Sequence, residues 1–341
     1  MIIASKISLS RNLKGFLFPQ VLDVETSKII ADEIRDVFKN NRTYKKVELK
    51  TDEENERYKS LGIITDNFKN NILDKELFSN KNKTINIMIN EESHIKINST
   101  LSSDKILTLY YEIKKIEEKI DSKLPFAFDE KFGYLTSNVN ILGTGMIPSL
   151  IVHIPMLELS GQISNIKNSI SKVGLSIRPY FSKTDNSPGG FYEVYSKITL
   201  GISEKEAITN LKIMVSKILE KEKILRGELI KKEKLRIMDE VNRALGILNN
   251  AKIITYKETE VLISYIKLGI DMKLFDESKL PFLSKFDVYE VLTNVSDEVL
   301  NLENLNDIEF FKVNNMNVSK KLKVDFLRMQ KIKDILNYEK K

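Results

Sequence analysis

The chain has 341 residues, which is long enough to bury a sizeable core and to form two domains. Its lack of cysteine excludes disulfides, thiolate metal sites and cysteine nucleophiles, and two histidines, His94 and His153, are too few for a multi-histidine metal site. No apolar run reaches the roughly 20 residues that span a bilayer. We therefore expect a cytoplasmic protein with no membrane association and no metal held by protein side chains alone.

The formal net charge of +6 would suit an anionic partner. However, only nine of the 54 basic residues are arginines, and the lysines alternate with glutamates on predicted helical faces such as residues 231–240. No basic patch alternates with aromatic residues on which bases would stack. Nucleic acid is therefore not an expected partner.

Residues 1–25 predict a strand followed by a turn, and residues 26–41 predict an amphipathic helix, because large apolar residues recur at helical spacing. The stretch 71–83 is interpreted as the end of a helix followed by a turn. Residues 84–98 alternate isoleucine with polar residues on both sides of a short polar turn, which predicts an antiparallel hairpin. A helix rich in leucine, isoleucine and tyrosine is expected over 103–122.

The middle of the chain continues to mix strands, loops and a helix. Residues 128–145 predict a strand and a glycine loop, and residues 163–174 predict a helix. An extended segment is expected over 175–181, a loop over 182–190 and a further strand over 191–201. These hairpin-like connections differ from the repeated βαβ units of a parallel sheet.

The pattern changes after residue 202, because residues 203–248 carry helical periodicity throughout. Thr255 and Glu258 have the spacing of a capping box for the next helix, and more helix is expected to the end of the chain. The fold class is therefore α+β over the first two-thirds and all-helical over the last third. We place the boundary near residue 225, inside or beside a long helix.

Five stretches in the same order resemble the ATP:guanidino phosphotransferases, and most closely the bacterial protein arginine kinases. They are ASKISLSRNLKGFLFP (4–19), INEESHIKI (89–97), FDEKFGYLTS (128–137), LGTG (142–145) and YSKITLGISEKE (195–206). The similarity extends into the helical third, where residues 242–272 resemble the C-terminal domain of those kinases.

The resemblance implies a twisted antiparallel sheet flanked by helices, followed by an all-helical C-terminal domain. It implies a guanidino-kinase-like catalytic domain over 1–225 and a domain for dimerisation or regulation over 226–341. The implied reaction is phosphoryl transfer from Mg-ATP to arginine side chains of proteins, which depends on positioning and charge neutralisation more than on covalent help from the protein. The implied partners are a protein substrate or a regulatory protein, and a second copy of the chain.

The resemblance also assigns roles to individual residues, since planar guanidinium groups and ammonium groups hold phosphates and carboxylates hold an acceptor guanidinium. The positions aligned with phosphate ligands are Ser5, Lys6, Arg11, Lys96 and Arg178. The carboxylates of the hairpin turn that correspond to catalytic residues are Glu91 and Glu92. The remnant of a phosphoarginine-sensing motif consists of Asp325 and Arg328.

Several positions depart from the family pattern. Where the family has arginine, this chain has Lys6, Ser8, Lys96 and Ile147, and Glu76 stands where the family has histidine. Both glutamates of the acceptor-side loop are missing from residues 182–186. Exchange of arginine for lysine in a lysine-rich chain explains Lys6 and Lys96, but not Ser8, Ile147 or Glu76.

Each lost preorganised charge donor typically costs about 3–4 kcal/mol of transition-state stabilisation. Two hypotheses follow. Either the chain is a divergent protein arginine kinase with weakened activity, or it is a non-catalytic relative that binds and regulates a partner or an arginine-bearing protein. Phosphoarginine formation that depends on Glu91 distinguishes the two.

Overall fold

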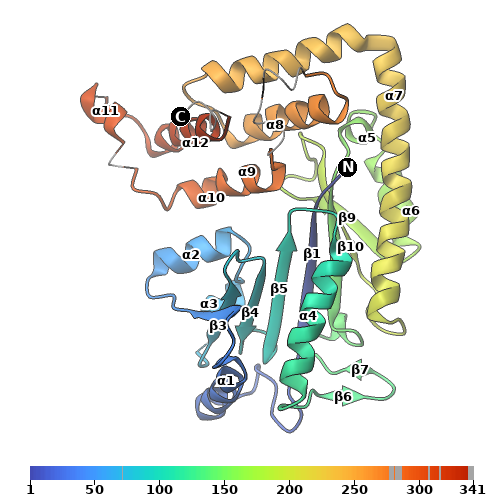
Figure 1. Cartoon of the computed structure of the whole chain (residues 1–341), viewed down its shortest axis with the longest axis vertical. Helices are drawn as coiled ribbons and strands as arrows, with labels where there is room; N and C mark the ends of the chain where they lie inside the picture. Colours follow the sequence, from blue (N-terminus) through green and yellow to red (C-terminus); the bar gives the residue numbers. More distant parts are fainter. Residues whose placement is uncertain (71, 276–279, 281–285, 306–307, 315, 337–341) are drawn as a thin grey trace.

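The computed structural model describes residues 1–70, 72–275, 280, 286–305, 308–314 and 316–336 (Figure 1). Within these residues, eight strands form one antiparallel sheet in the order β2-β3-β4-β5-β1-β8-β10-β9. The strands are β1 (Ile2–Arg11), β2 (Tyr44–Val47), β3 (Glu76–Asn80), β4 (Ile85–Ile89), β5 (Ile95–Leu101), β8 (Met146–His153), β9 (Leu175–Pro179) and β10 (Phe191–Ser196). A separate two-stranded ribbon consists of β6 (Phe128–Asp129) and β7 (Gly133–Tyr134).

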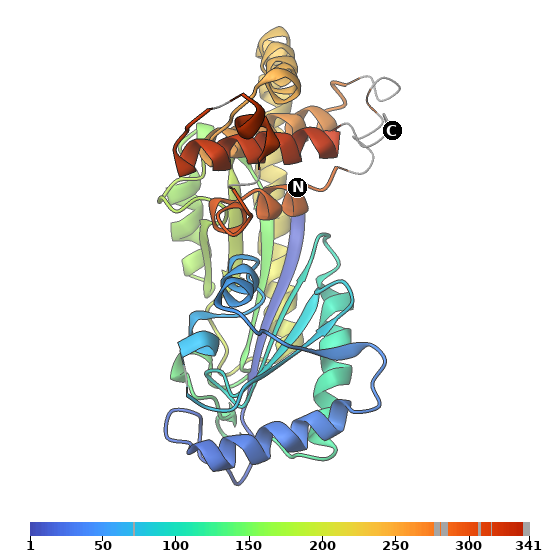
Figure 2. The ribbon, with the colours of Figure 1, turned by 90° about the vertical axis from the view of Figure 1, so that its left-hand side faces the viewer.

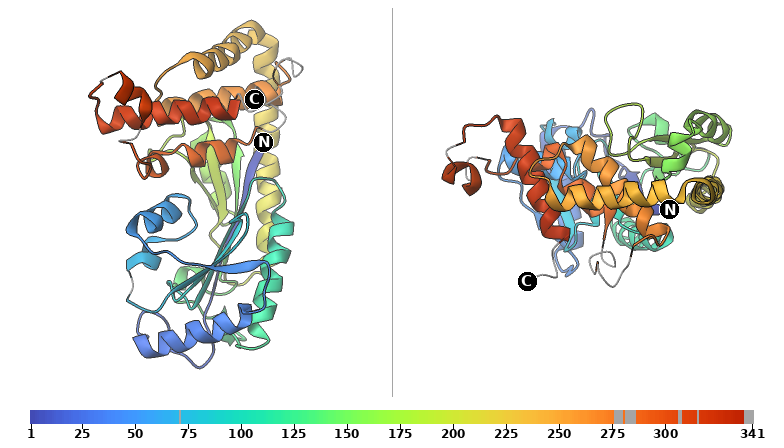
Figure 3. Two further views of the ribbon diagram at one scale, coloured as in Figure 1. Left: turned by 60° about the vertical axis from the view of Figure 1, so that its left-hand side comes forward. Right: turned by 90° about the horizontal axis from the view of Figure 1, so that it is seen from above.

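Helices pack on both faces of this sheet and lie beyond its ends. They are α1 (Val24–Phe38), α2 (Asp52–Ser60), α3 (Asp66–Asn70), α4 (Ile106–Asp121), α5 (Pro155–Leu159), α6 (Ile163–Ser171), α7 (Glu204–Asn250), α8 (Tyr256–Asp271), α9 (Val288–Asn294), α10 (Asp297–Leu300), α11 (Glu309–Val313) and α12 (Lys320–Leu336). Figures 2 and 3 show α8 and α12 stacked beyond one end of the sheet and α1 at the opposite end. The expected fold, an antiparallel sheet flanked by helices and followed by a helical region, is confirmed.

The main core lies between the sheet and four helices, α1, α4, α6 and α7. Helix α4 turns a stripe of isoleucine and leucine toward the sheet because these residues recur every three or four positions. From the sheet, alternate residues of β1 point into the same core, among them Ile7 and Leu9. None of the helices in the described ranges is long and apolar enough to cross a bilayer.

The other face of the sheet is partly covered by the helical region. Ala4, Ile151 and Phe191 share a second core with apolar residues of α8, α9 and α12. Leu77 and Met88 of the same face pack against apolar residues around α2 and α3, and the strands between these two clusters carry the polar side chains of the candidate site.

Helix α7 connects the sheet to the helical region. It begins at the N-cap Ser203, whose capping box with Glu206 agrees with a helix predicted from residue 203. The helical backbone is interrupted at Glu233 (φ −133°, ψ 32°), where Figure 1 shows the helix turning sharply toward α8. At the next helix start, Thr255 caps α8 by accepting from the Glu258 N–H, which is one half of the capping box that the spacing predicts.

A buried polar cluster joins α7 to β8 and α8. Glu222 accepts from Arg226 at 2.7 Å, and Arg226 also pairs with Asp271 of α8 at 2.9 Å. His153 is stacked on Phe191, and its Nε2 lies 2.8 Å from a hydroxyl of α8. His153 is therefore a core histidine with its hydrogen-bonding groups satisfied.

The hairpin expected over residues 84–98 is confirmed as β4 and β5, but the interpretation of residues 71–83 as a helix end and a turn is wrong. Residues 76–80 form strand β3, which pairs with β4 on one side and β2 on the other. Both Leu77 and Phe78 are buried because the two faces of this strand pack against different apolar clusters. A strand with two buried faces lacks the alternation by which half-buried strands are identified. Residue 71 lies outside the described residues.

Arg11 lies at the C-terminal end of β1 and is one of the largest fully buried side chains among the described residues. Its Nε donates to Glu117 of α4 and one Nη to Glu204 of α7, both at 2.6 Å. The other Nη donates to two carbonyls, those of Ser10 and Thr144, and the guanidinium lies over the ring of Tyr134 at 3.5 Å. One side chain thus joins the central strand, two helices and the glycine loop.

The glycine loop approaches this guanidinium closely. Gly145 has a φ of +58°, and a Cβ there would lie 2.6 Å from the Ser10 carbonyl oxygen and 2.7 Å from Nη1 of Arg11. Only glycine fits this position without displacing the buried arginine.

His94 ends the turn between β4 and β5 and is also buried. Its Nδ1 accepts from the Leu13 N–H at 3.0 Å, and its Nε2 donates to the Leu17 carbonyl at 2.9 Å. Burial lowers the pKa of His94 to about 4. The neutral ring therefore holds the segment after β1 against the hairpin.

Substitution Arg11→Met should lower the free energy of unfolding by about 3–5 kcal/mol, because it leaves the carboxylates of Glu117 and Glu204 without their main buried partner. The control is Arg236→Met, which removes an exposed pair with Glu233 and should cost less than about 1 kcal/mol. Chemical denaturation measures both. Equal effects of the two substitutions would contradict the structural role of Arg11.

Stability should fall between pH 6.5 and about pH 4, because the unfolded chain binds a proton at His94 in this range and the folded chain does not. At pH 5 this linkage amounts to about 2 kcal/mol. The stability deficit of His94→Gln relative to the unmodified protein should therefore shrink by that amount between pH 7 and pH 5. The deficit of Ile97→Val, a buried change without a titrating group, should stay constant, and parallel behaviour of the two variants would refute the assignment.

Candidate functional site

The alternation of β1 divides the residues of the proposed phosphate clamp between two faces of the sheet. Ser5 and Arg11 lie on the helix-covered face with Ile7 and Leu9, and the Ser5 hydroxyl donates to the Ser103 carbonyl at 2.7 Å. Lys6 lies on the opposite face. The structure therefore does not bring Ser5 and Arg11 together with Lys6, and the donors of Arg11 are engaged by protein acceptors.

The face that carries Lys6 continues across the neighbouring strands. Ser8 of β1 lies opposite Ile147 of β8 on one side and Asn98 of β5 on the other, and its hydroxyl donates to Asn98 at 3.0 Å. Lys96 lies two residues from Asn98 along β5, opposite Ser10, and is therefore on the same face. Positions 8 and 147, at which the family carries arginine, are thus cross-strand neighbours. Both missing positive charges are therefore lost from the same part of the sheet face.

The two carboxylates of the hairpin turn lie beside Lys96. Its ammonium is 3.0 Å from Glu91 and 3.5 Å from Glu92. Glu91 is buried rather than exposed, accepting hydrogen bonds from the Thr65 hydroxyl and from the Glu92 N–H. Asn138, from the loop after β7, donates to Glu92 at 3.2 Å. This surrounding shell fixes both carboxylates in place.

Lys75 stands near Glu91 and donates to the Phe68 carbonyl. Burial lowers the pKa of Lys75 to about 8, although the charge of Glu91 acts in the opposite direction. Sequence reasoning missed Thr65, Lys75 and Asn138, because none of them belongs to a motif and only the fold brings them to the hairpin turn.

Lys6 and Arg178 meet at a buried carboxylate, Glu193 of β10. Lys6 lies 3.3 Å from one oxygen of Glu193, and Arg178 donates to the other through Nε at 2.7 Å and Nη2 at 2.6 Å. Burial raises the pKa of Glu193, but the charges of Lys6 and Arg178 outweigh it and hold that pKa below its usual value. The sequence contained no signal for this residue beyond its place in a strand.

The charges of six side chains on this face balance. Three cations, Lys6, Lys96 and Arg178, are paired with three carboxylates, Glu91, Glu92 and Glu193. The site thus brings five of the sequence-predicted residues onto one surface, where each cation is already paired within the chain.

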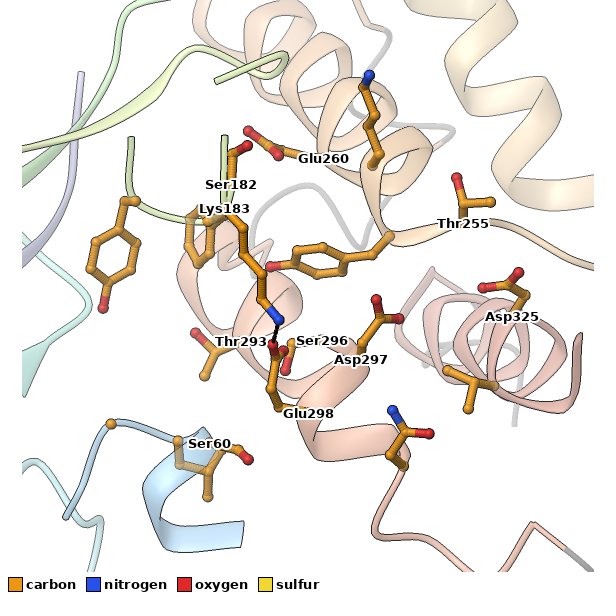
Figure 4. A pocket seen from close by; sticks show the side chains of 18 of the residues that line it. Ser60, Ser182, Lys183, Thr255, Glu260, Thr293, Ser296, Asp297, Glu298 and Asp325 are labelled. Carbon is orange, nitrogen blue, oxygen red and sulfur yellow. Dashed lines mark ion pairs between the residues drawn. The ribbon is translucent and has the colours of Figure 1, made fainter. Parts of the chain in front are cut away.

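A cavity of about 810 Å³ lies beside this face, between the loop after β9 and the helical region (Figure 4). It is lined by residues from the end of α2, the start of α8, α9, α10 and α12. Lys183 of the loop extends across it to an ion pair with Glu298 of α10. Tyr180 lines the cavity and also lies under Lys6, at 4.8 Å from its ammonium, so the two features are continuous.

The predicted sensing residues lie at this cavity. Asp325 is in its wall and pairs with Arg328, one turn further along α12. Arg328 is fully buried and also donates to Asp297 and to the carbonyls of Val295 and Ile254. The two residues thus form an ion pair, and the donors of the arginine are directed at protein acceptors.

Glu260 of α8 forms another side of the cavity. It accepts from the Ser187 hydroxyl at 2.6 Å and from the Gly189 N–H at 3.2 Å. Burial raises the pKa of Glu260 despite these hydrogen bonds. The contacts fix the end of the 182–190 loop against the helical region.

Comparison with family models and with known proteins agrees with this architecture. Residues 25–225 match the family described as ATP:guanido phosphotransferase, C-terminal catalytic domain. Residues 234–295 match the family described as Protein-arginine kinase McsB C-terminal domain.

Among curated proteins, the protein-arginine kinase of Clostridium acetobutylicum is 31% identical over 306 residues, which cover 88% of each chain. That of Caldanaerobacter subterraneus subsp. tengcongensis is 35% identical over 277 residues, covering 79% of this chain and 82% of the relative.

Solved structures support the fold alone, because their sequences are more distant. The duplicated taurocyamine kinase of Schistosoma mansoni aligns with a TM-score of 0.60 at 23% identity, over 71% of this chain and 37% of that one. Lombricine kinase aligns with a TM-score of 0.59 at 17% identity, over 67% of each chain. The family match covers residues 25–225, and the curated relatives align with most of this chain. This chain therefore belongs to the ATP:guanido phosphotransferase family.

Proposed function

We propose that this protein transfers a phosphoryl group from Mg-ATP to arginine side chains of proteins, at a strongly reduced rate. The observation that carries the proposal is the pair of fixed carboxylates, Glu91 and Glu92, at one edge of a sheet face that also holds Lys6, Lys96 and Arg178. The names of the curated relatives, protein-arginine kinase, support the same acceptor. Because ATP is the donor, we place the activity in the cytoplasm.

Glu91 and Glu92 would hold the acceptor guanidinium, because paired carboxylate oxygens match its planar donors. Lys6, Lys96 and Arg178 would contact the donor phosphates from the same face. Mg-ATP supplies the γ-phosphoryl group, and the protein contributes position and charge. We assign Ser5 and Arg11 to the support of β1, because both side chains point into the helix-covered side.

The reduced rate follows from the charges on this face. Ser8 and Ile147 supply no cation where the family has arginine, and the three cations that remain are balanced by three carboxylates. With about 3–4 kcal/mol for each lost donor, two losses lower the rate by several orders of magnitude even if they are not additive.

The second candidate is a non-catalytic relative that binds a regulatory partner or an arginine-bearing protein. The even charge balance favours it, because a face without excess positive charge attracts a triphosphate poorly. We propose residues 226–341 as the regulatory or dimerising part and residues 1–225 as the kinase-like part. A phosphoarginine side chain that binds to Arg328 would have to displace Asp325 and Asp297, the carboxylates that now pair with it.

The deciding experiment is mass spectrometry for phosphoarginine on an arginine-rich test protein, incubated with this chain and Mg-ATP without acidification. The expected result is phosphoarginine above the enzyme-free control. Glu91→Ala should abolish the signal, because it removes the buried acceptor of the guanidinium.

The matched control is Glu118→Ala, which removes an exposed carboxylate on the outer side of α4 and should leave the yield unchanged. If the folded protein forms no phosphoarginine but retains the arginine-rich protein in a pull-down, the non-catalytic alternative replaces the kinase.

A further inference from the structure

Glu193 pairs with both Lys6 and Arg178, the two side chains on the inner part of the sheet face that resemble phosphate ligands. One of its oxygens lies 3.3 Å from Lys6 and accepts from Ser149 at 2.8 Å. The other accepts from Nε and Nη2 of Arg178. Glu193 itself lies directly opposite Arg178 in the pairing of β10 with β9. A single carboxylate thus bridges two cations that come from strands on opposite sides of it.

The contact with Arg178 uses the edge of the guanidinium that is best suited to an anion. Nε and Nη2 point in parallel, and this fork binds carboxylate and phosphate oxygens in the same way. A phosphate approaching Arg178 therefore competes with Glu193 for one pair of donors.

The exposure of the three side chains shows how such a competition would proceed. The side chains of Arg178 and Lys6 are 60% and 28% exposed, whereas that of Glu193 is 4% exposed. An incoming polyanion would meet the two cations first, with the carboxylate beneath them. At this depth its charge is poorly screened by solvent and opposes a second anion.

We infer that Glu193 is an internal counter-anion that occupies the phosphate-binding groups of Lys6 and Arg178 and sets a low affinity of this face for polyphosphates. The inference rests on the proposed function, in that this face is taken as the donor side. On this inference Lys6 and Arg178 are available to a phosphate only when it displaces a carboxylate of the same chain.

The test is the binding of inorganic tripolyphosphate, measured by isothermal titration calorimetry on the full chain. Glu193→Gln keeps the shape and removes the charge, so the variant should bind at least about tenfold more tightly than the unmodified protein. Adding Lys6→Met to Glu193→Gln should reverse most of the gain. Glu303→Gln, which releases Lys331 in the helical region, is the matched control and should bind as the unmodified protein does.

Unchanged or weaker binding by Glu193→Gln would overturn the inference, because Glu193 would then act only to position Arg178. If Glu193→Gln does not fold, Glu193→Met decides in the same way, since it also removes the charge and keeps a side chain of similar length. A gain with Glu193→Met supports the inference, and no gain refutes it. The binding measurement does not depend on catalysis. Absence of phosphoarginine would refute the proposed function, whereas an unchanged affinity of Glu193→Gln for tripolyphosphate would refute only this inference.

Discussion

The buried guanidinium of Arg11 is the constraint on which the rest of the structure depends. It joins β1 to α4, α7 and the glycine loop through two carboxylates and two carbonyls. A buried cation is stable only if such partners surround it, and each partner in turn fixes the element that carries it. Burial raises the pKa of Glu117, but Arg11 and Lys114 outweigh it and hold that pKa below its usual value. The scaffold around the sheet is therefore tied together at one point, on the side away from the candidate site.

This division between the two faces separates the support of the fold from the candidate chemistry. The helix-covered face depends on close packing and on the Arg11 cluster. On the opposite face, Ser8 is accommodated by a hydrogen bond to Asn98, and Glu193 by ion pairs with Lys6 and Arg178. A kinase-like scaffold is thus compatible with a face of balanced charge. Helix α7 kinks at Glu233, and the helical region that follows lies against the same face and lines the cavity beside it.

Much of the site could be identified from the sequence because its motifs are short and local. Glu91, Glu92 and Lys96 lie within one hairpin, so their proximity followed from the turn between two alternating runs. Arg178 and Lys6 could be assigned to strands but not to each other. Glu193, Thr65 and Asn138 carry no motif, and their roles became visible only when distant segments were brought side by side.

The sequence by itself determined the alternation of the hairpin, the periodicity of α4 and α7, the capped starts of α7 and α8, and the absence of cysteine chemistry, because these depend on neighbours within a few residues. Only the tertiary structure decided which side of β1 faces the helices, and hence that Arg11 and Lys6 point in opposite directions. It also decided that Glu76 lies on a strand, where the pairing of β3 with two neighbours overrides its local pattern. Burial and ion pairing are properties of the packed sheet, and no local pattern carries them.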